Sequence, residues 1–272
     1  MDTKRILYVS QEIHPYLPEN EISKPSLMLP KKMNEMGNQV RVFMPRYGLI
    51  NERRHQLHEV IRLSGINIIV NDMDQPLVIK VASVPQARMQ VYFIDNEEYF
   101  KRKAIFRDEE DRFFADNDQR AVFFCRGVIE TVKKLGWSPD IIHCHGWMAS
   151  FMPLYLKRFH SDDPIFADSK TVLSVYGGSD DKLGDGLKKT LSFDGLNGED
   201  LQNYQQTDIN SIYKAAVNYV DGAIIASDKV DDEVAKVVRE KAEHCIEHPG
   251  DSASAEEVAN LYENIAIEES IA

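Results

Sequence analysis

The sequence predicts an α/β protein built on a doubly wound, Rossmann-like parallel sheet. Short apolar runs alternate with helical segments along most of the 272 residues, which is the pattern of a sheet with helices on both faces. The apolar runs are short and continuous, as in buried strands. The first unit already has this form, because strand 6–9, helix 23–36 and strand 40–44 make a βαβ unit.

A small β-rich insertion follows this unit. Three runs rich in branched residues lie at residues 58–70, 77–84 and 90–94. We expect the first two to be outer strands and the third to return to the main sheet. Asn71-Asp72 and Pro85-Gln86 are predicted as the turns between them.

The next segments predict one short and one long helix. Residues 97–118 are highly charged with interleaved aromatic residues and predict a helix followed by a surface loop. Residues 117–135 form the clearest helix of the chain, and Gly136 closes it. Its apolar residues make a continuous stripe at Ala121, Phe124, Val128, Val132 and Leu135.

The alternation of strand and helix then resumes. Residues 141–145 predict a buried strand, residues 147–159 a helix despite Pro153, and residues 171–176 another strand. Residues 178–206 are rich in Gly, Asp, Lys and Asn. This composition predicts a long polar loop, which we expect to be the most mobile region.

The end of the chain predicts one more strand between two helices. Helix 208–220 has Asp208 as a candidate cap, strand 223–226 is expected to be the last of the sheet, and residues 230–243 are helical.

A break at Pro249-Gly250-Asp251 separates these elements from an acidic helix at 255–268. We therefore expect one domain over residues 1–250 and a C-terminal helix within residues 251–272 that packs back on it.

The composition excludes several classes of function. Acidic residues outnumber basic ones 44 to 32, and the net charge of −12 disfavours binding to nucleic acid or to anionic membranes. There is no apolar run of about 18 residues, so no transmembrane helix is expected. The chain enters its first strand without a signal-peptide core, which predicts a cytoplasmic protein. Cys125, Cys144 and Cys245 are widely spaced and predict free thiols.

The carboxyl ends of the predicted strands carry the residues most suited to binding. Ligands of open parallel sheets bind at this edge. Arg46 and Tyr47 follow one strand, His145 and Trp147 follow another, and Tyr176 ends a third. Trp147 and Tyr176 could stack on the apolar face of a hexose while neighbouring polar groups bind its hydroxyls. Alternatively, Trp147 is a helix-to-sheet packing residue.

Two further motifs have a simpler interpretation. His143 and His145 lie on one face of a strand and could chelate a metal, but no third ligand is evident nearby. The sequence therefore predicts neither a metal site nor a cofactor. Gly177-Gly178 could let a ligand approach the backbone closely, although a plain turn is the favoured interpretation of the pair.

The order of these strand ends resembles the opening of bacterial glycogen and starch synthases, glycosyltransferase family 5. The resemblance covers roughly residues 4–235. Its clearest segments are Lys4–Ser10 (KRILYVS), Glu12–Tyr16 (EIHPY), Val40–Gly48 (VRVFMPRYG), Asp116-Asn117 before the long helix, and Pro139–Trp147 (PDIIHCHGW). Leu29–Lys31, Met36-Gly37, the strand reaching Tyr176 and Asn210–Ser227 continue it.

The resemblance implies the amino-terminal half of a GT-B fold, in which two Rossmann-like domains face each other across a cleft. It also implies ADP-glucose:α-1,4-glucan glucosyltransferase ancestry, with the acceptor glucan on the side of this first domain. The resemblance and the strand ends together predict seven residues as carbohydrate contacts: Arg46, Tyr47, Asp116, Asn117, His145, Trp147 and Tyr176.

The departures from the family pattern concern the donor site. Where the family has Lys-Thr-Gly-Gly-Leu, this chain has Pro18-Glu19-Asn20-Glu21-Ile22. Glycines and a lysine at that point let the backbone approach and neutralise a diphosphate, and the replacements put two carboxylates there. The family's His-Asp-Trp is His145-Gly146-Trp147, and its Val-His-Asn is Val175-Tyr176-Gly177. The family's second domain, with its donor-binding residues, has no counterpart in these 272 residues.

These departures predict a catalytically incomplete domain that binds an α-glucan or a partner protein, and no residue is assigned a catalytic role. The alternative is one half of a split, ADP-glucose-dependent glucosyltransferase whose donor domain is a second chain. We also expect the C-terminal helix to cover the surface that the family covers with its own carboxyl-terminal helix.

Overall fold

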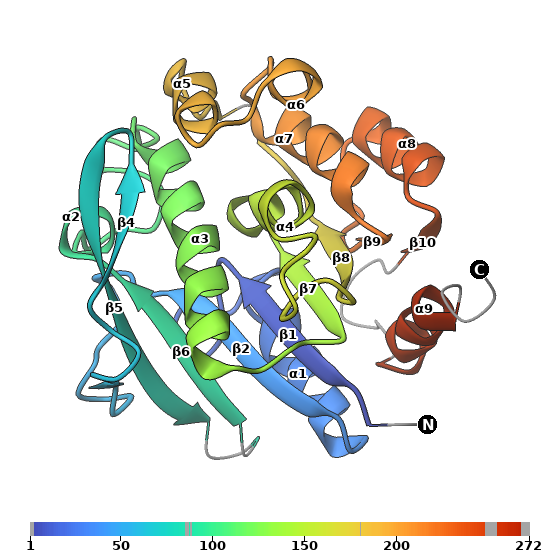
Figure 1. The fold of residues 1–272 in the computed structure, drawn as a ribbon, viewed down its shortest axis with the longest axis horizontal. Coiled ribbons are helices and arrows are strands. Elements are labelled where there is room, and N and C mark those ends of the chain that lie inside the picture. The colour runs from blue at the N-terminus through green and yellow to red at the C-terminus, as the bar shows by residue number, and fades with distance from the viewer. Residues whose placement is uncertain (1–2, 85–86, 88, 180, 248–254, 268–272) are drawn as a thin grey trace.

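A computed structural model describes residues 3–84, 87, 89–179, 181–247 and 255–267. Its centre is one large sheet with helices on both faces (Figure 1). The strand order is β10-β9-β8-β7-β1-β2-β6-β5-β3, with β4 paired to β5. The prediction of an α/β, doubly wound fold is confirmed.

Within the described residues, seven strands run parallel and make up the Rossmann-like part of the sheet: β1 (Arg5–Ser10), β2 (Gln39–Pro45), β6 (Met89–Asp95), β7 (Ile141–His145), β8 (Lys170–Val175), β9 (Gly222–Ile225) and β10 (His244–Glu247). The register sets Ser10 beside His145 and His145 beside Ser174. The carboxyl ends of β1, β7 and β8 are therefore level with one another.

The β-rich insertion adds the antiparallel strands β3 (His58–Glu59), β4 (Ile66–Val70) and β5 (Met73–Val84). The predicted strand over 58–70 is thus two short strands. The predicted turn at Asn71-Asp72 is confirmed, and both residues have positive φ, as a tight two-residue hairpin requires. The turn predicted at Pro85-Gln86 lies outside the described residues.

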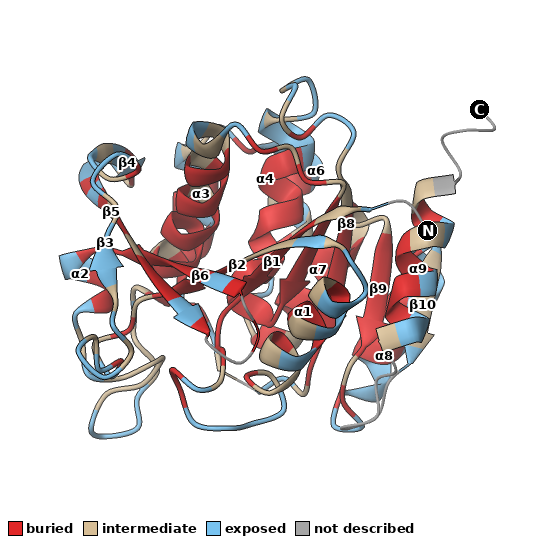
Figure 2. Ribbon diagram, turned by 90° about the horizontal axis from the view of Figure 1, so that it is seen from below, coloured by how far each residue is buried: buried red, intermediate tan, exposed pale blue. Residues whose placement is uncertain are grey.

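The helices are α1 (Pro25–Glu35), α2 (Glu97–Phe100), α3 (Asn117–Leu135), α4 (Met152–Phe159), α5 (Gly186–Phe193), α6 (Gly198–Asn203), α7 (Ile209–Ala216), α8 (Asp232–Lys241) and α9 (Ala255–Ile267), with 3-10 turns at Trp147–Phe151 and Val217–Tyr219. α3 and α4 cover one face of the sheet and α1 covers the other (Figure 2). The helices that the sequence predicts lie close to their expected places, and the core fills the space between helices and sheet.

Local signals explain several helix ends. α3 spans the predicted residues and stops at Gly136, whose φ of 57° is left-handed. The side chain of Asp208 accepts a hydrogen bond from the Ser211 amide, which confirms it as the cap of α7. Pro153 lies in the first turn of α4, where its missing N–H costs no helical hydrogen bond.

Residues 178–206 are not the predicted loop, because they contain α5 and α6. Leu183, Leu187 and Leu191 are spaced four residues apart and are fully buried. Arg126 of α3 ties this segment down through an ion pair of 2.7 Å with Asp194. The polar residues that suggested a loop lie on the outer faces of short amphipathic helices.

The sheet also extends one strand beyond the predicted last one. β10 pairs in parallel with β9, and α9 contacts both β10 and α1. The predicted break at 249–251 lies outside the described residues. None of the helices in the described residues combines the length and the apolar character needed to cross a membrane.

Candidate functional site

A pocket of about 450 Å³ opens at the carboxyl ends of the central strands. Gln11 and Glu12 directly follow β1, Trp147 follows β7, and Gly177 follows β8. Its walls come from the segment before α3, from residues 177–179 and 181, and from α7. The lining residues are Gln11, Glu12, Ile22, Ile105, Phe106, Arg107, Phe113, Trp147, Gly177, Gly178, Ser179, Asp181, Ile209 and Tyr213.

Trp147 lies at the base of this pocket within an aromatic cluster. Its ring centroid is 5.0 Å from that of Phe106 and 5.8 Å from that of Phe113. The indole is only 5% exposed, so it packs within the fold and lines the pocket at the same time. An apolar, ring-lined floor of this kind suits the apolar face of a sugar or an aliphatic side chain.

Of the seven residues proposed as carbohydrate contacts, Trp147 alone is among the lining residues described. Tyr47 and Asn117 are fully buried, and the Tyr47 hydroxyl donates to the Met148 sulfur at 3.5 Å. Tyr176 and His145 are each 1% exposed and hydrogen bonded to each other at 2.8 Å. These four side chains lie within the core that supports the strand ends.

The remaining two predicted residues are engaged in ion pairs. Arg46 Nε lies 2.9 Å from Asp95 Oδ2, in a cluster that also holds Glu52 and Lys80. Asp116 accepts from Arg102 Nη1 at 2.7 Å. Each charge is balanced within the chain, so a ligand would have to displace an existing partner.

The two strand histidines are neutral parts of the core. Burial lowers the pKa of His145 to about 3 and holds the pKa of His143 well below its usual value. Both ring nitrogens of His143 have partners, the Tyr262 hydroxyl at 2.6 Å and Ser174 Oγ at 2.7 Å. Among the described residues, no three groups of the metal-binding kind come together.

The loop before α1 is held in place by its own polar side chains. Asn20 Nδ2 donates to Glu12 Oε2 at 2.6 Å, and Gln11 Nε2 donates to Glu12 Oε1 at 3.1 Å. Glu21 Oε2 accepts from Ser227 Oγ at 2.9 Å and from Lys229 Nζ at 3.4 Å. Asn20 and Glu21 therefore connect the loop before α1 to the end of β1 and to the loop after β9.

Close backbone approaches explain two glycines at this edge. Gly146 has a φ of 85°, and a Cβ atom there would collide with the Gln11 side-chain amide. A Cβ at Gly178 would collide with the Asn210 side chain. Gly178 thus permits close contact with the chain's own α7, and Gly177 lies against Lys229, so neither glycine forms the plain turn that the sequence favours.

Several pocket residues are not predicted by the sequence patterns, above all Phe106, Arg107 and Phe113. All three lie in the charged segment before α3, for which those patterns predict a surface loop. The interleaved aromatic residues of that segment are the available signal, because rings in an otherwise charged stretch need a surface to pack on.

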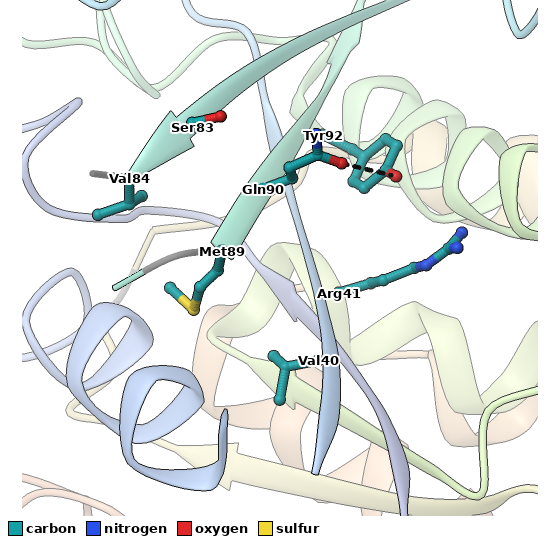
Figure 3. Close-up of a pocket in the computed structure, with 7 residues that line it drawn as sticks. All are labelled: Val40, Arg41, Ser83, Val84, Met89, Gln90 and Tyr92. Carbon is teal, nitrogen blue, oxygen red and sulfur yellow. Dashed lines mark hydrogen bonds between the residues drawn. The ribbon is translucent and has the colours of Figure 1, made fainter. Parts of the chain in front are cut away.

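A second opening lies at the other end of the sheet. It has a volume of about 470 Å³ and is lined by residues of β2, β5 and β6 (Figure 3). Val40 and Met89 lie at the amino ends of two parallel strands, opposite the edge where parallel sheets bind ligands. The Arg41 guanidinium is already placed 4.8 Å from the Trp137 ring centre. We therefore assign the candidate site to the pocket over Trp147.

The family profile described as starch synthase catalytic domain matches residues 5–247. The glycogen synthases of Chlorobium limicola and Chlorobium luteolum are each 40% identical to this chain over 173 residues. Those alignments cover 63% of this chain and 35% of each relative, so the chain spans about a third of their length.

Among solved structures, the catalytic domain of starch synthase IV from Arabidopsis thaliana, bound to ADP and acarbose, matches with a TM-score of 0.74 and 15% identity. The match covers 91% of this chain and 52% of that one. At this identity the likeness concerns the fold. The family resemblance indicated by the sequence is confirmed.

Proposed function

This chain belongs to the starch synthase catalytic domain family, and from that premise we propose that it binds an α-glucan in the pocket over Trp147 without transferring glucose from ADP-glucose. The acarbose bound to the solved starch synthase supports a glucan ligand, since the two proteins share a fold. A cytoplasmic location, in keeping with three free thiols, is part of the same proposal.

The loop at residues 18–22 carries the argument against glucosyl transfer. A diphosphate needs positive charge and open backbone amides at that point. This loop instead presents Glu21, which Ser227 and Lys229 hold in place, and the neighbouring Glu12 is only 7% exposed. At an effective dielectric of about 20, exchanging an attractive for a repulsive charge at close range disfavours an anion by several kcal/mol.

The charge of the pocket also argues against binding of a nucleotide diphosphate. Among its described lining residues, the carboxylates of Glu12 and Asp181 outnumber the single guanidinium of Arg107. Asp181 accepts a hydrogen bond of 2.6 Å from Arg107 Nη2, which neutralises that cation. A neutral ligand with an apolar face and hydroxyl groups fits such a pocket better than a nucleotide diphosphate.

Calorimetric titration with ADP-glucose, ADP and maltoheptaose in separate runs tests this proposal. We expect heat from maltoheptaose only. The Trp147→Leu variant should lose that binding, whereas the control Trp137→Leu should keep it because Trp137 is not among the pocket's lining residues.

Clear binding of ADP or ADP-glucose would overturn this interpretation of the 18–22 loop. Such binding would favour the alternative function, a split glucosyltransferase that is completed by a second chain. If none of the three titrations produced heat, glucan binding would be contradicted. A protein partner would then be the expected ligand at this edge of the sheet.

A further inference from the structure

An ion pair joins two walls of the candidate pocket. Arg107 belongs to the segment before α3 and Asp181 to the segment after β8, and the two residues are 74 positions apart in the sequence. Arg107 Nη2 lies 2.6 Å from Asp181 Oδ1. The Arg107 side chain is 39% exposed and that of Asp181 is 18% exposed, whereas Trp147 is 5% exposed. The pair therefore lies on the solvent side of the pocket and the indole at its base.

Each end of the pair is fixed by contacts of its own. The backbones of Arg107 and Phe113 form an antiparallel β-bridge. Arg107 Nη1 also donates a hydrogen bond to the Asp111 carbonyl at 2.7 Å, so residues 107–113 form a closed hairpin. On the other wall, the Ile209 amide donates to the Asp181 carbonyl at 3.1 Å. Ser179 Oγ donates to Asp181 Oδ2 at 2.6 Å. Arg107 and Asp181 are therefore both held in positions from which they can form the ion pair.

The hairpin is otherwise attached to the pocket floor through its rings. Phe113 and the adjacent Phe106 pack against Trp147, and neither of these ring contacts involves residues 177–179 or 181. The neighbouring Arg112 makes only local pairs, with Asp108 at 2.8 Å and Glu110 at 2.7 Å. Arg107 is thus the residue of this hairpin whose ion pair reaches the opposite wall.

We propose that the Arg107–Asp181 ion pair is a strap across the mouth of the pocket over Trp147 in the ligand-free protein, and that it limits access to the indole until the pair breaks. The strap rests on the proposed function only in naming the pocket as the binding site, because its closure is a property of the free chain. A partly exposed ion pair is weak enough to open under thermal motion and is screened by salt.

The two tryptophans of the chain allow a test that needs no ligand. The Trp137→Phe background leaves Trp147 as the only indole, and it keeps a ring beside Arg41. Acrylamide quenching then reports access to the pocket floor, and acrylamide is uncharged, so a change of charge at residue 107 does not alter its local concentration. We expect Arg107→Gln to raise the quenching constant at least about twofold.

Two further variants separate the strap from a general loosening. Arg112→Gln removes an arginine of the same hairpin with only local partners, and its quenching should equal that of the background. The charge exchange Arg107→Asp with Asp181→Arg should bring quenching back towards the background value. About 1 M sodium chloride should raise quenching in the background protein and have little effect in Arg107→Gln.

The strap is refuted if Arg107→Gln leaves quenching unchanged, or if Arg112→Gln raises it equally. Failure of the charge exchange to reduce quenching would also overturn it, provided that circular dichroism shows the folded protein. These outcomes are independent of maltoheptaose, so the strap and glucan binding can fail separately.

Discussion

At the scale of single residues, the edge of the sheet is shaped by the backbone around Gly146. Its conformation, with a φ of 85°, is one that favours glycine. The Gln11 side chain fills the space a Cβ would need and accepts a hydrogen bond from the Met148 amide at 3.2 Å. The local backbone and its packing therefore both require glycine here.

Gly146→Ala should destabilise the protein by at least about 3 kcal/mol, because strain at positive φ adds to a collision with Gln11. Gly136→Ala is the matched control, since Gly136 also has positive φ but no neighbouring atom within 4 Å of the place a Cβ would take. We expect it to cost about 1 kcal/mol. Urea unfolding measures both, and equal losses would contradict the role of Gln11.

The buried histidines should make stability depend on pH. Their pKa values are lowered in the folded protein, His145 to about 3, whereas in the unfolded chain they titrate near the ordinary 6.5. Between these values the unfolded state binds more protons, so the free energy of unfolding falls as pH decreases through this window.

Urea unfolding between about pH 7 and pH 5 should show a slope approaching 1.4 kcal/mol per pH unit for each such histidine. His145→Gln should reduce that slope whatever its effect on absolute stability. A slope identical to that of the parent protein would show that His145 is not the group responsible.

At the scale of elements, α9 docks onto the rest of the chain through contacts centred on Tyr262. The Tyr262 hydroxyl is shared by Tyr8 at 2.9 Å and His143 at 2.6 Å, both in the central strands. Ile265 packs where a Cβ at Gly222 would lie, and Lys4 pairs with Glu263 at 3.1 Å. α9 is therefore joined to the sheet by apolar, polar and charged contacts. That it covers the surface used by the family's own carboxyl-terminal helix remains a proposal.

Tyr262→Phe should cost about 1 to 3 kcal/mol, because it leaves a buried nitrogen of His143 without its partner. Tyr8→Phe removes only the second, longer bond, and we expect a loss of about 1 kcal/mol or less. Chemical denaturation of the two variants and their combination checks this order. A larger loss for Tyr8→Phe would contradict the central place of Tyr262.

At the scale of the whole molecule, the β-rich insertion and the C-terminal helix share one core with the parallel sheet. β5 pairs with β6 over seven residue positions, from Val78 opposite Asp95 to Val84 opposite Met89. Ile68 and Val70 of β4 and Leu261 of α9 belong to the same cluster of buried side chains. The domain boundary near residue 250 remains a prediction.

Because the core is continuous, we expect a single cooperative unfolding transition. Far-ultraviolet circular dichroism, near-ultraviolet circular dichroism and tryptophan fluorescence should give coincident denaturation curves. An early transition seen by one probe alone would show that the insertion or the C-terminal helix unfolds independently.

The fold class, most elements, the family and the edge of the sheet where a site would lie can all be predicted from the amino-acid sequence. Those features depend on periodicity and end signals that are local in the chain, such as the stripe of α3 closed by Gly136. Local patterns do not predict α5 and α6 because their leucines are separated by many polar residues, nor β10 because its burial is only partial.

The set of side chains that meet in the pocket becomes visible in the three-dimensional structure. Tyr47, His145 and Tyr176 follow or end strands as predicted, yet they are buried in the core, while Phe106 and Arg107 reach the pocket from the segment before α3. Contacts such as Arg107 with Asp181 or Glu21 with Lys229 join residues far apart in the sequence. They depend on how the loops pack over the sheet, and local patterning does not encode that packing.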